Sequence, residues 1–185
     1  MRIILLIILI IVLACLFINT IKIKGGNQLN FMCDIVPNIT TERLTIKQAY
    51  VKDLPTINNI LKTGGDFIYL KKISKNNFDN TKYFIAYSNK KPIAVTGFKY
   101  VKWNYIEPRF SNTSTVVLPE YRNRGYMSEI QKALTRYILH NTSINTISVQ
   151  IHKDNIANIK VMKKIGYVVE FERDDHVFMK IIDSS

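Results

Sequence analysis

The sequence predicts an α/β (α+β) domain built on a mixed, mostly antiparallel sheet with helices on both faces. Segments with alternating or continuous apolar residues, which are typical of strands, are interleaved with segments whose apolar residues recur at helical spacing. Two of the strand-like runs flank a short polar turn, a pattern that predicts an antiparallel hairpin. At 185 residues the chain has room for one domain with a proper hydrophobic core.

The first half of the domain is expected to contain a strand, a helix and the hairpin. Alternation of apolar and polar residues predicts a strand over residues 41–47, and helical spacing predicts a helix over residues 53–62. The apolar runs 84–87 and 93–98 are joined by the polar turn 88–92, so we expect these two runs to pair with each other.

The second half is expected to alternate strands with helices before a final pair of strands. In order, the expected elements are a strand at 113–118, a long amphipathic helix at 126–140, a strand at 146–151, a helix at 155–165, and strands at 168–172 and 177–182.

The turn that precedes the long helix has an unusual composition. An apolar run stops at Pro119, two arginines and Gly125 follow, and a helix-like pattern starts at Tyr126. A strand that breaks into a turn and then opens a helix presents unpaired backbone N–H groups, which cradle a phosphate or pyrophosphate. An ordinary strand-to-helix turn punctuated by a glycine is the alternative interpretation of this stretch alone.

Two segments together resemble a known family. Residues 117–127 read V-L-P-E-Y-R-N-R-G-Y-M, and residues 155–167 read N-I-A-N-I-K-V-M-K-K-I-G-Y. They resemble the pyrophosphate loop V-x-P-x-x-R-x-x-G-x-(G/A) and the helix N-x-x-(A/S)-x-x-(L/V)-x-x-K-x-G-(F/Y) of the GNAT superfamily of acetyl-CoA-dependent N-acetyltransferases. The opening T-E-R-L at residues 41–44 is similar to the T-x-R-L start of the branch that acetylates ribosomal-protein N-termini. The resemblance spans residues 41–182.

The resemblance implies an acetyltransferase-type fold, acetyl-CoA as co-substrate and an amine acceptor, either a protein N-terminus or a small-molecule amine. It also implies that the pantetheine arm enters a gap between the strands expected at 113–118 and 146–151. A backbone N–H near Val117 would then face the thioester carbonyl. The implied coenzyme-binding residues are Val117, Arg122, Asn123, Arg124, Gly125, Tyr126, Met127, Asn155 and Asn158.

The sequence also departs from the family pattern. Met127 stands where the loop carries a small residue, and Met162 stands where many members carry a tyrosine general acid. Asn158 stands where the ribosomal-protein branch often carries a serine, and an amide cannot supply a proton as a hydroxyl can. No acidic residue lies between Arg109 and Pro119. The catalytic acid and base are therefore unassigned, and a non-catalytic tethered protein with a structural or interaction role stays open as the alternative function.

The N-terminal segment predicts a membrane anchor. Residues 3–21 carry no charge and are almost entirely apolar, which approaches the ~20 residues that a spanning helix needs. We expect a transmembrane anchor at 1–24, a linker at 25–40 and the acetyltransferase-like domain at 41–185. The alternatives are a cleavable secretory signal, for which the apolar run is long, and a lipoprotein signal that ends at Cys15.

The flanking charges decide the expected orientation of a single-pass protein. One arginine precedes the apolar segment, and Lys22 and Lys24 follow it. The positive-inside rule therefore leans towards a cytoplasmic C-terminal domain, and the supply of acetyl-CoA that the resemblance implies leans the same way.

The remaining composition narrows the possible partners. The formal net charge of +12 favours anionic ligands, coenzyme A among them, but the lysines are scattered and no nucleic-acid-binding motif accompanies them. We therefore expect no nucleic-acid partner. His140, His152 and His176 are dispersed along the chain, so we expect no metal site. The two cysteines, Cys15 and Cys33, exclude a disulfide framework.

Overall fold

The computed structural model describes residues 36–64, 72–78, 81–103 and 107–183. The predicted anchor at 3–21 lies outside these ranges. Within them, no helix combines the length and the apolar character that crossing a membrane requires.

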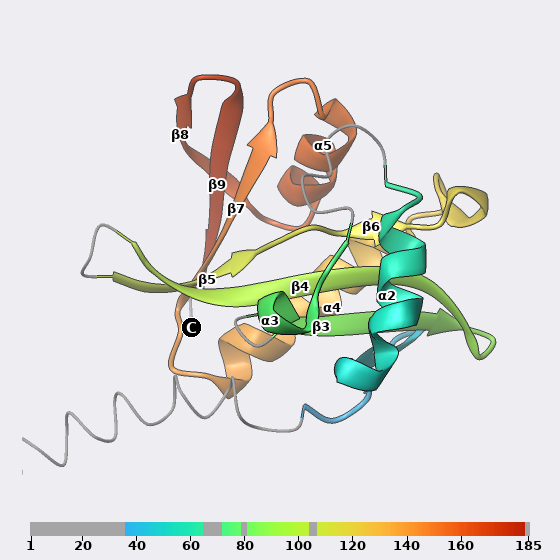
Figure 1. Cartoon of the computed structure of the whole chain (residues 1–185). Coiled ribbons are helices and arrows are strands. Elements are labelled where there is room, and N and C mark those ends of the chain that lie inside the picture. Colours follow the sequence, from blue (N-terminus) through green and yellow to red (C-terminus); the bar gives the residue numbers. More distant parts are fainter. Residues whose placement is uncertain (1–35, 65–71, 79–80, 104–106, 184–185) are drawn as a thin grey trace, which may run out of the picture. The chain divides into compact units, whose positions relative to one another are not determined.

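The described strands form one mixed, mostly antiparallel sheet, as predicted (Figure 1). Their order across the sheet is β1-β2-β3-β4-β5-β7-β9-β8, and β6 pairs with β4 beside β5. Among the described pairings, only that between β5 and β7 is parallel. The strands are β1 (Ile39–Thr40), β2 (Thr45–Gln48), β3 (Lys82–Ser88), β4 (Lys91–Trp103), β5 (Glu107–Asn112), β6 (Val116–Val117), β7 (Thr146–His152), β8 (Val168–Arg173) and β9 (His176–Ile182).

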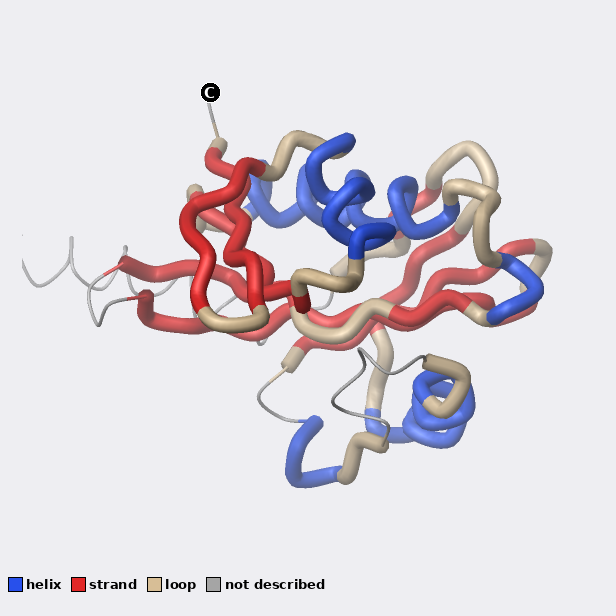
Figure 2. Tube along the Cα trace, turned by 90° about the horizontal axis from the view of Figure 1, so that it is seen from above, coloured by secondary structure: helices blue, strands red, loops and turns tan. Residues whose placement is uncertain are grey.

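Helices cover both faces of the sheet, which confirms the predicted layering (Figure 2). Helices α4 and α5 lie on one face, and α2 and α3 lie on the other. The helices are α2 (Leu54–Leu61), α3 (Lys75–Phe78), α4 (Tyr126–Asn141) and α5 (Ile156–Lys164), and two short 3-10 turns are η1 (Val51–Asp53) and η2 (Pro119–Tyr121).

Each face of the sheet buries its own apolar layer. Tyr83 and Ile85 of β3 belong to the cluster beneath α2, because alternate strand residues point to the same face. On the opposite side, α4 buries Ile130, Leu134 and Ile138, which recur every four residues along one stripe of the helix. Burial of such a side chain stabilises the fold by roughly 1.5–3 kcal/mol, so the two layers fix the sheet from both sides.

The predicted single strand at 113–118 is wrong, because the chain makes two strands there with a break between them. Strand β5 ends at Asn112 and pairs with the second half of β4, whereas β6 pairs with Ala94 and Val95 in the first half. The stretch E-P-R-F-S-N of β5 is too polar to be recognised as a strand from periodicity alone. The partner strand β4, which runs to Trp103 rather than to residue 98, determines its pairing.

Smaller differences concern the start of the domain. Strand β1 lies within the stretch expected to be linker, and Val36 is buried, with its N–H donating to the Gln48 side-chain oxygen at 2.7 Å. Helix α3 also lies where no element was predicted. Each element spans only about one period of its pattern, so periodicity carries little information about them.

Candidate functional site

The parallel strands β5 and β7 diverge and open a cavity. They pair only from Phe110 to Asn112, opposite Ile147 to Val149, and beyond this point β6 continues along β4 while β7 continues along β9. A cavity of about 940 Å³ lies at the divergence and is lined by residues from both strands, from α4 and from α5. The predicted gap exists, but it separates β7 from the break between β5 and β6 rather than from one continuous strand.

A buried hydrogen-bond network holds the break in place. The Gln131 amide of α4 donates to the hydroxyls of Thr115 at 2.6 Å and Thr96 at 3.1 Å. The Asn112 amide donates to the Gln131 oxygen at 3.2 Å, and the two threonine hydroxyls lie 2.6 Å apart. Leaving a buried polar group without a hydrogen-bond partner costs about 1–3 kcal/mol of stability. The network therefore fixes the point at which strand β5 ends.

The turn before α4 forms one end of the cavity, which we call the phosphate end. Gly125 caps the helix with a left-handed φ of 79°, and Asn123 also has a positive φ, of 59°. The Gly125 carbonyl accepts from the Glu129 N–H, so the earlier N–H groups of the first turn have no intrahelical acceptor. These N–H groups lie at the positive end of the helix dipole, which fits a phosphate or pyrophosphate. The cavity is lined here by Tyr121, Arg122, Asn123, Gly125, Tyr126, Met127 and Ser128.

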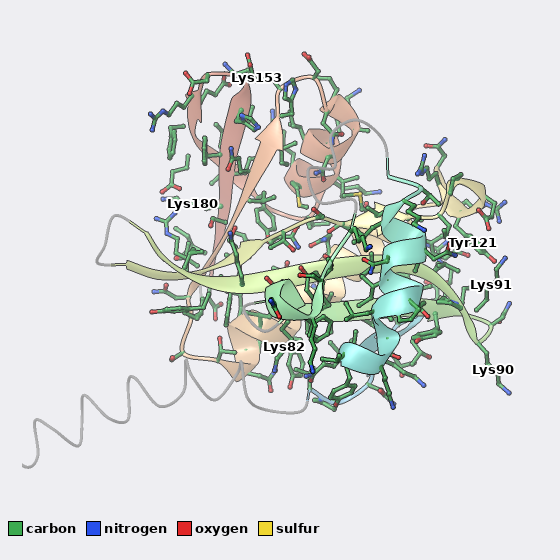
Figure 3. The ribbon with its side chains drawn as sticks, in the orientation of Figure 1. Lys82, Lys90, Lys91, Tyr121, Lys153 and Lys180 are labelled. Atoms are coloured by element: carbon green, nitrogen blue, oxygen red, sulfur yellow. The ribbon has the colours of Figure 1, made fainter. Side chains whose placement is uncertain are left out.

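The two arginines of the turn have different roles. Arg122 donates from Nε to the Val117 carbonyl at 3.0 Å and from a terminal nitrogen to the Thr63 carbonyl at 2.6 Å. This side chain therefore ties the turn to β6 and to the end of α2. Arg124 does not line the cavity; its guanidinium lies 5.9 Å from the centre of the Tyr121 ring. The Lys91 ammonium lies 5.3 Å from the same ring, so positive charge gathers around Tyr121 at this end (Figure 3).

Side chains of the T-E-R-L segment at residues 41–44 hold the same turn in position. Arg43 donates to the Glu129 carboxylate from Nε at 2.8 Å and from a terminal nitrogen at 2.6 Å, and to the Arg124 carbonyl at 2.9 Å. The Thr41 hydroxyl also donates to Glu129. Burial by itself raises the pKa of Glu129, but the hydrogen bonds from Thr41 and Arg43 outweigh it, so this pKa lies below its ordinary value. Arg43 and Glu129, which stand 86 residues apart in the sequence, thus hold this turn in place.

The asparagines of the second motif lie on the wall formed by α5. The Asn155 side-chain oxygen caps the helix by accepting from the Asn158 N–H at 3.2 Å. Asn158 lines the cavity, and its buried side-chain oxygen has no hydrogen-bond partner among the described residues. A buried acceptor without a donor fits a ligand that brings its own N–H groups, as the pantetheine arm of coenzyme A does. Met162 is fully buried and does not line the cavity.

Eight of the nine residues predicted to bind the coenzyme line the cavity, and Arg124 is the exception. Their contact with the coenzyme stays a prediction. The first turn of α4 and the unpaired Asn158 oxygen are the groups that best fit it.

The other end of the cavity, which we call the acceptor end, lies on the face opposite α4. Asn112 bonds to Gln131 of α4, so strand alternation places its neighbour Ser111 on the opposite face. Burial raises the pKa of Tyr83 although Thr81 bonds to it, and the phenol therefore stays protonated near neutrality. The cavity is lined here by Thr81, Tyr83, Lys99, Ser111, Thr113, Gln150, His152 and His176.

Two histidines that stand apart in the sequence meet at the acceptor end. His152 and His176 are paired directly across β7 and β9, and their ring centres are 5.4 Å apart. The Nδ1 atom of His152 accepts from the Asp154 N–H at 3.2 Å. Sequence spacing does not predict this histidine pair, because the two residues come together only through the pairing register of β7 and β9. The described residues hold no cluster of three or more metal-binding side chains.

An ion cluster around the buried Arg109 supports the acceptor end. Arg109 donates to both oxygens of Glu170, at 2.7 and 3.0 Å, and Lys180 of β9 donates to the same carboxylate at 3.0 Å. Hydrogen bonding from Arg109, and then from Lys180, lowers the pKa of Glu170 despite its burial. The cluster connects β5 to β8 and β9 across β7, so it sets the position of the hairpin that carries His176.

A sheet that splays at its parallel pair, with an unsatisfied helix N-terminus at the open end, is an arrangement that fits a phosphate-bearing ligand. The acetyltransferase (GNAT) domain family matches residues 43–168, and the chain belongs to this family. It is an N-acetyltransferase that uses acetyl-CoA as co-substrate.

The chain is similar to several known proteins. It is 26% identical over 140 residues to the uncharacterized N-acetyltransferase YnaD of Bacillus subtilis, covering 70% of this chain and 81% of the relative. Its fold matches ribosomal-protein-S5-alanine acetyltransferase from Vibrio fischeri with a TM-score of 0.64 and 15% identity, covering 80% of this chain and 98% of that one. It matches spermidine N-acetyltransferase from Vibrio cholerae, in complex with CoA and spermine, with a TM-score of 0.61 and 16% identity, covering 78% and 98%. At these identities, the two structures show the fold alone.

Proposed function

We propose that this N-acetyltransferase acts on a primary amine that enters from the acceptor end, with the α-amine of a protein N-terminus as the first candidate. The observation that carries the proposal is one cavity lined both by the first turn of α4 and by His152 and His176. A co-substrate held at the phosphate end and an amine arriving at the acceptor end would meet where β5 and β7 diverge.

In the proposed reaction, the amine nitrogen forms a bond to the acetyl carbonyl carbon and the carbon–sulfur bond breaks. One proton leaves the nitrogen and one reaches the sulfur. Histidine is the side chain that most often acts as a general base, so His152 and His176, which line this end, are the groups to take the amine proton, directly or through water. Met162 offers no hydroxyl to the leaving sulfur, and water would supply that proton. Positioning of the two reactants provides much of the remaining rate enhancement.

The charges at the acceptor end favour a single amine over a polyamine. Lys99 lines this end together with the two histidines, and a cation there disfavours a substrate with several positive charges. The motif resemblance to the ribosomal-protein branch points to the same choice. A small-molecule amine is the second candidate, since the similar Vibrio cholerae fold belongs to a spermidine N-acetyltransferase.

The test is release of the coenzyme thiol from acetyl-CoA by the full-length protein in detergent. The acceptors are peptides with free N-termini, matched peptides with blocked N-termini, polyamines and aminoglycosides. Release with the free peptides alone supports the proposal. Release with polyamines alone overturns the proposed acceptor, and tight coenzyme binding without release by any acceptor would favour the non-catalytic alternative.

We also propose that residues 3–21 anchor the enzyme in a membrane as a single-pass protein, with the catalytic domain in the cytoplasm. The support is the uncharged apolar segment and the two lysines that follow it. Carbonate extraction of expressed full-length protein tests the proposal. Recovery in the soluble fraction would contradict it, and a mature N-terminus at Cys15 would replace it with a lipid anchor.

A further inference from the structure

One hydroxyl group at the acceptor end is buried without a partner. Thr113 directly follows β5, and its N–H donates to the Gly97 carbonyl at 2.8 Å, which holds the residue against β4. Thr113 lines the cavity, and its side-chain oxygen has almost no accessible surface and finds no hydrogen-bond partner among the described residues.

Gly97 makes the space in which this hydroxyl lies. A Cβ atom added at residue 97 would overlap the Thr113 oxygen and would lie 2.9 Å from both Thr81 and Tyr83. Residue 97 therefore has to be glycine because three side chains pack against its α-carbon and leave no room for a Cβ atom. All three of these side chains also line the cavity.

Two nearby threonines have hydroxyl groups with a structural role, and both of these hydroxyl groups are hydrogen-bonded within the protein. Thr115 lies in the same break and Thr96 lies on the adjacent strand β4, and both are hydrogen-bonded to Gln131 and to each other. Thr113 takes no part in that network. Valine has nearly the same shape and would avoid the cost of an unpaired buried hydroxyl, so the threonine calls for a partner that none of the described residues supplies.

We propose that the Thr113 hydroxyl binds the acceptor amine, in a subsite formed by Thr81, Tyr83, Gly97 and Thr113. The hydroxyl oxygen accepts one N–H of the incoming nitrogen and so orients its lone pair towards the acetyl carbon. A primary amine can keep this N–H while its other proton leaves, whereas a secondary amine must give up its only one. The subsite therefore selects primary over N-methylated amines. This inference rests on the proposed function.

The test compares Thr113→Val, which removes the hydroxyl and keeps the branched shape, with Thr113→Ser, which keeps the hydroxyl. We expect Thr113→Val to lower kcat/KM for a primary amine on the order of tenfold and to reduce the preference for the primary over the N-methylated acceptor. The coenzyme Kd should not change, and Tm should stay equal or rise. Thr113→Ser should keep most of the activity and the preference.

Gly97→Ala provides a second test, because the added methyl group would overlap the Thr113 oxygen and force it out of its position in the subsite. It should abolish acceptor turnover while coenzyme binding is retained, and Gly97→Ala combined with Thr113→Ala should recover part of the folding stability. Unchanged kcat/KM and selectivity in Thr113→Val would overturn the inference, as would a lower Tm together with weaker coenzyme binding, which would make the hydroxyl structural. If the wild-type protein shows no acceptor-dependent release, the proposed function fails instead.

Discussion

The phosphate end and the acceptor end of the cavity are assembled in different ways. The phosphate end is formed largely by one stretch of chain, residues 121–128, and the groups there that fit a phosphate are backbone N–H groups. The acceptor end takes single side chains from β3, β4, β7 and β9 and from the break after β5. Backbone groups are arranged by local turn geometry, which a short motif encodes. Side-chain groups are brought together only by strand pairing.

The ends also differ in their arginine–glutamate pairs. At the phosphate end, the Arg43 side chain is 40% exposed, whereas at the acceptor end that of Arg109 is 3% exposed. Exposed ion pairs contribute little to stability. A buried guanidinium that loses its carboxylate partner, by contrast, strongly destabilises the folded protein. The acceptor end should therefore be the less tolerant of the two to loss of its ion pair.

The largest expected effect is that of Glu170→Leu. This change removes the carboxylate that neutralises the buried Arg109, so the free energy of unfolding should fall by about 3–5 kcal/mol in urea titrations. The control is Glu172→Leu, which removes an exposed pair with Lys153 and should cost less than about 1 kcal/mol. Equal losses in the two variants would show that burial does not distinguish them.

The histidine pair tests whether the acceptor end handles the amine proton. His176→Gln should lower kcat roughly 10²-fold, because general base catalysis contributes about 10²–10⁴-fold, while the coenzyme Kd stays unchanged. His140→Gln, an exposed histidine in the last turn of α4, is the control and should leave both quantities unchanged. A kcat for His176→Gln close to the wild-type value would remove the pair from the mechanism.

Gly125 tests the phosphate end. Its left-handed φ of 79° strains a β-branched residue, so Gly125→Val should weaken coenzyme binding by roughly 1–3 kcal/mol, measured by calorimetry. Gly125→Asn is the control, because asparagine tolerates this conformation and caps helices well. Arg124→Ala should cost less than Gly125→Val, since backbone donors make the contact. Normal affinity in a folded Gly125→Val protein would place the pyrophosphate elsewhere.

Two variants of Asn155 distinguish its role as the helix cap of α5 from direct contact with the coenzyme. Asn155→Ala removes the cap of α5 and should cost about 1 kcal/mol of stability, whereas Asn155→Ser keeps a capping oxygen and should cost little. If the Asn155 amide also donates to the coenzyme, both variants should bind it more weakly. Weaker binding in Asn155→Ala alone would limit the residue to its structural role.

The smallest effect concerns the brace at the phosphate end and depends on pH. The pKa of Glu129 lies below its ordinary value of 4.5 in the folded protein, so the unfolded state binds more protons between the two values. The stability that Glu129 contributes is therefore complete above about pH 4.5 and is lost as pH falls through the folded pKa. Urea titrations should show that Glu129→Gln is destabilising at pH 7 and that its difference from wild type shrinks below pH 4. A difference that grows in acid would contradict this sign.

The alternation of strands and helices predicted most elements of the fold to within a few residues, and periodicity failed in identifiable places. Strand β5 was missed because its polar, proline-containing sequence lacks the alternation of a strand, and its pairing comes from the long neighbour β4. The network of Thr96, Asn112, Thr115 and Gln131 was missed for a related reason. Its members belong to three parts of the chain, and nothing local distinguishes them from surface polar residues.

The sequence by itself determined the family and the phosphate end, because a turn that exposes backbone N–H groups needs glycine, proline and a helix start at fixed local spacing. It also placed Asn155 and Asn158 together, since one helical turn separates them. Only the tertiary structure decided the acceptor end. The His152–His176 pair depends on the register of β7 and β9, and the unpaired Thr113 hydroxyl depends on the space above Gly97. Such contacts join residues far apart in the chain, so they arise from packing rather than from any local pattern.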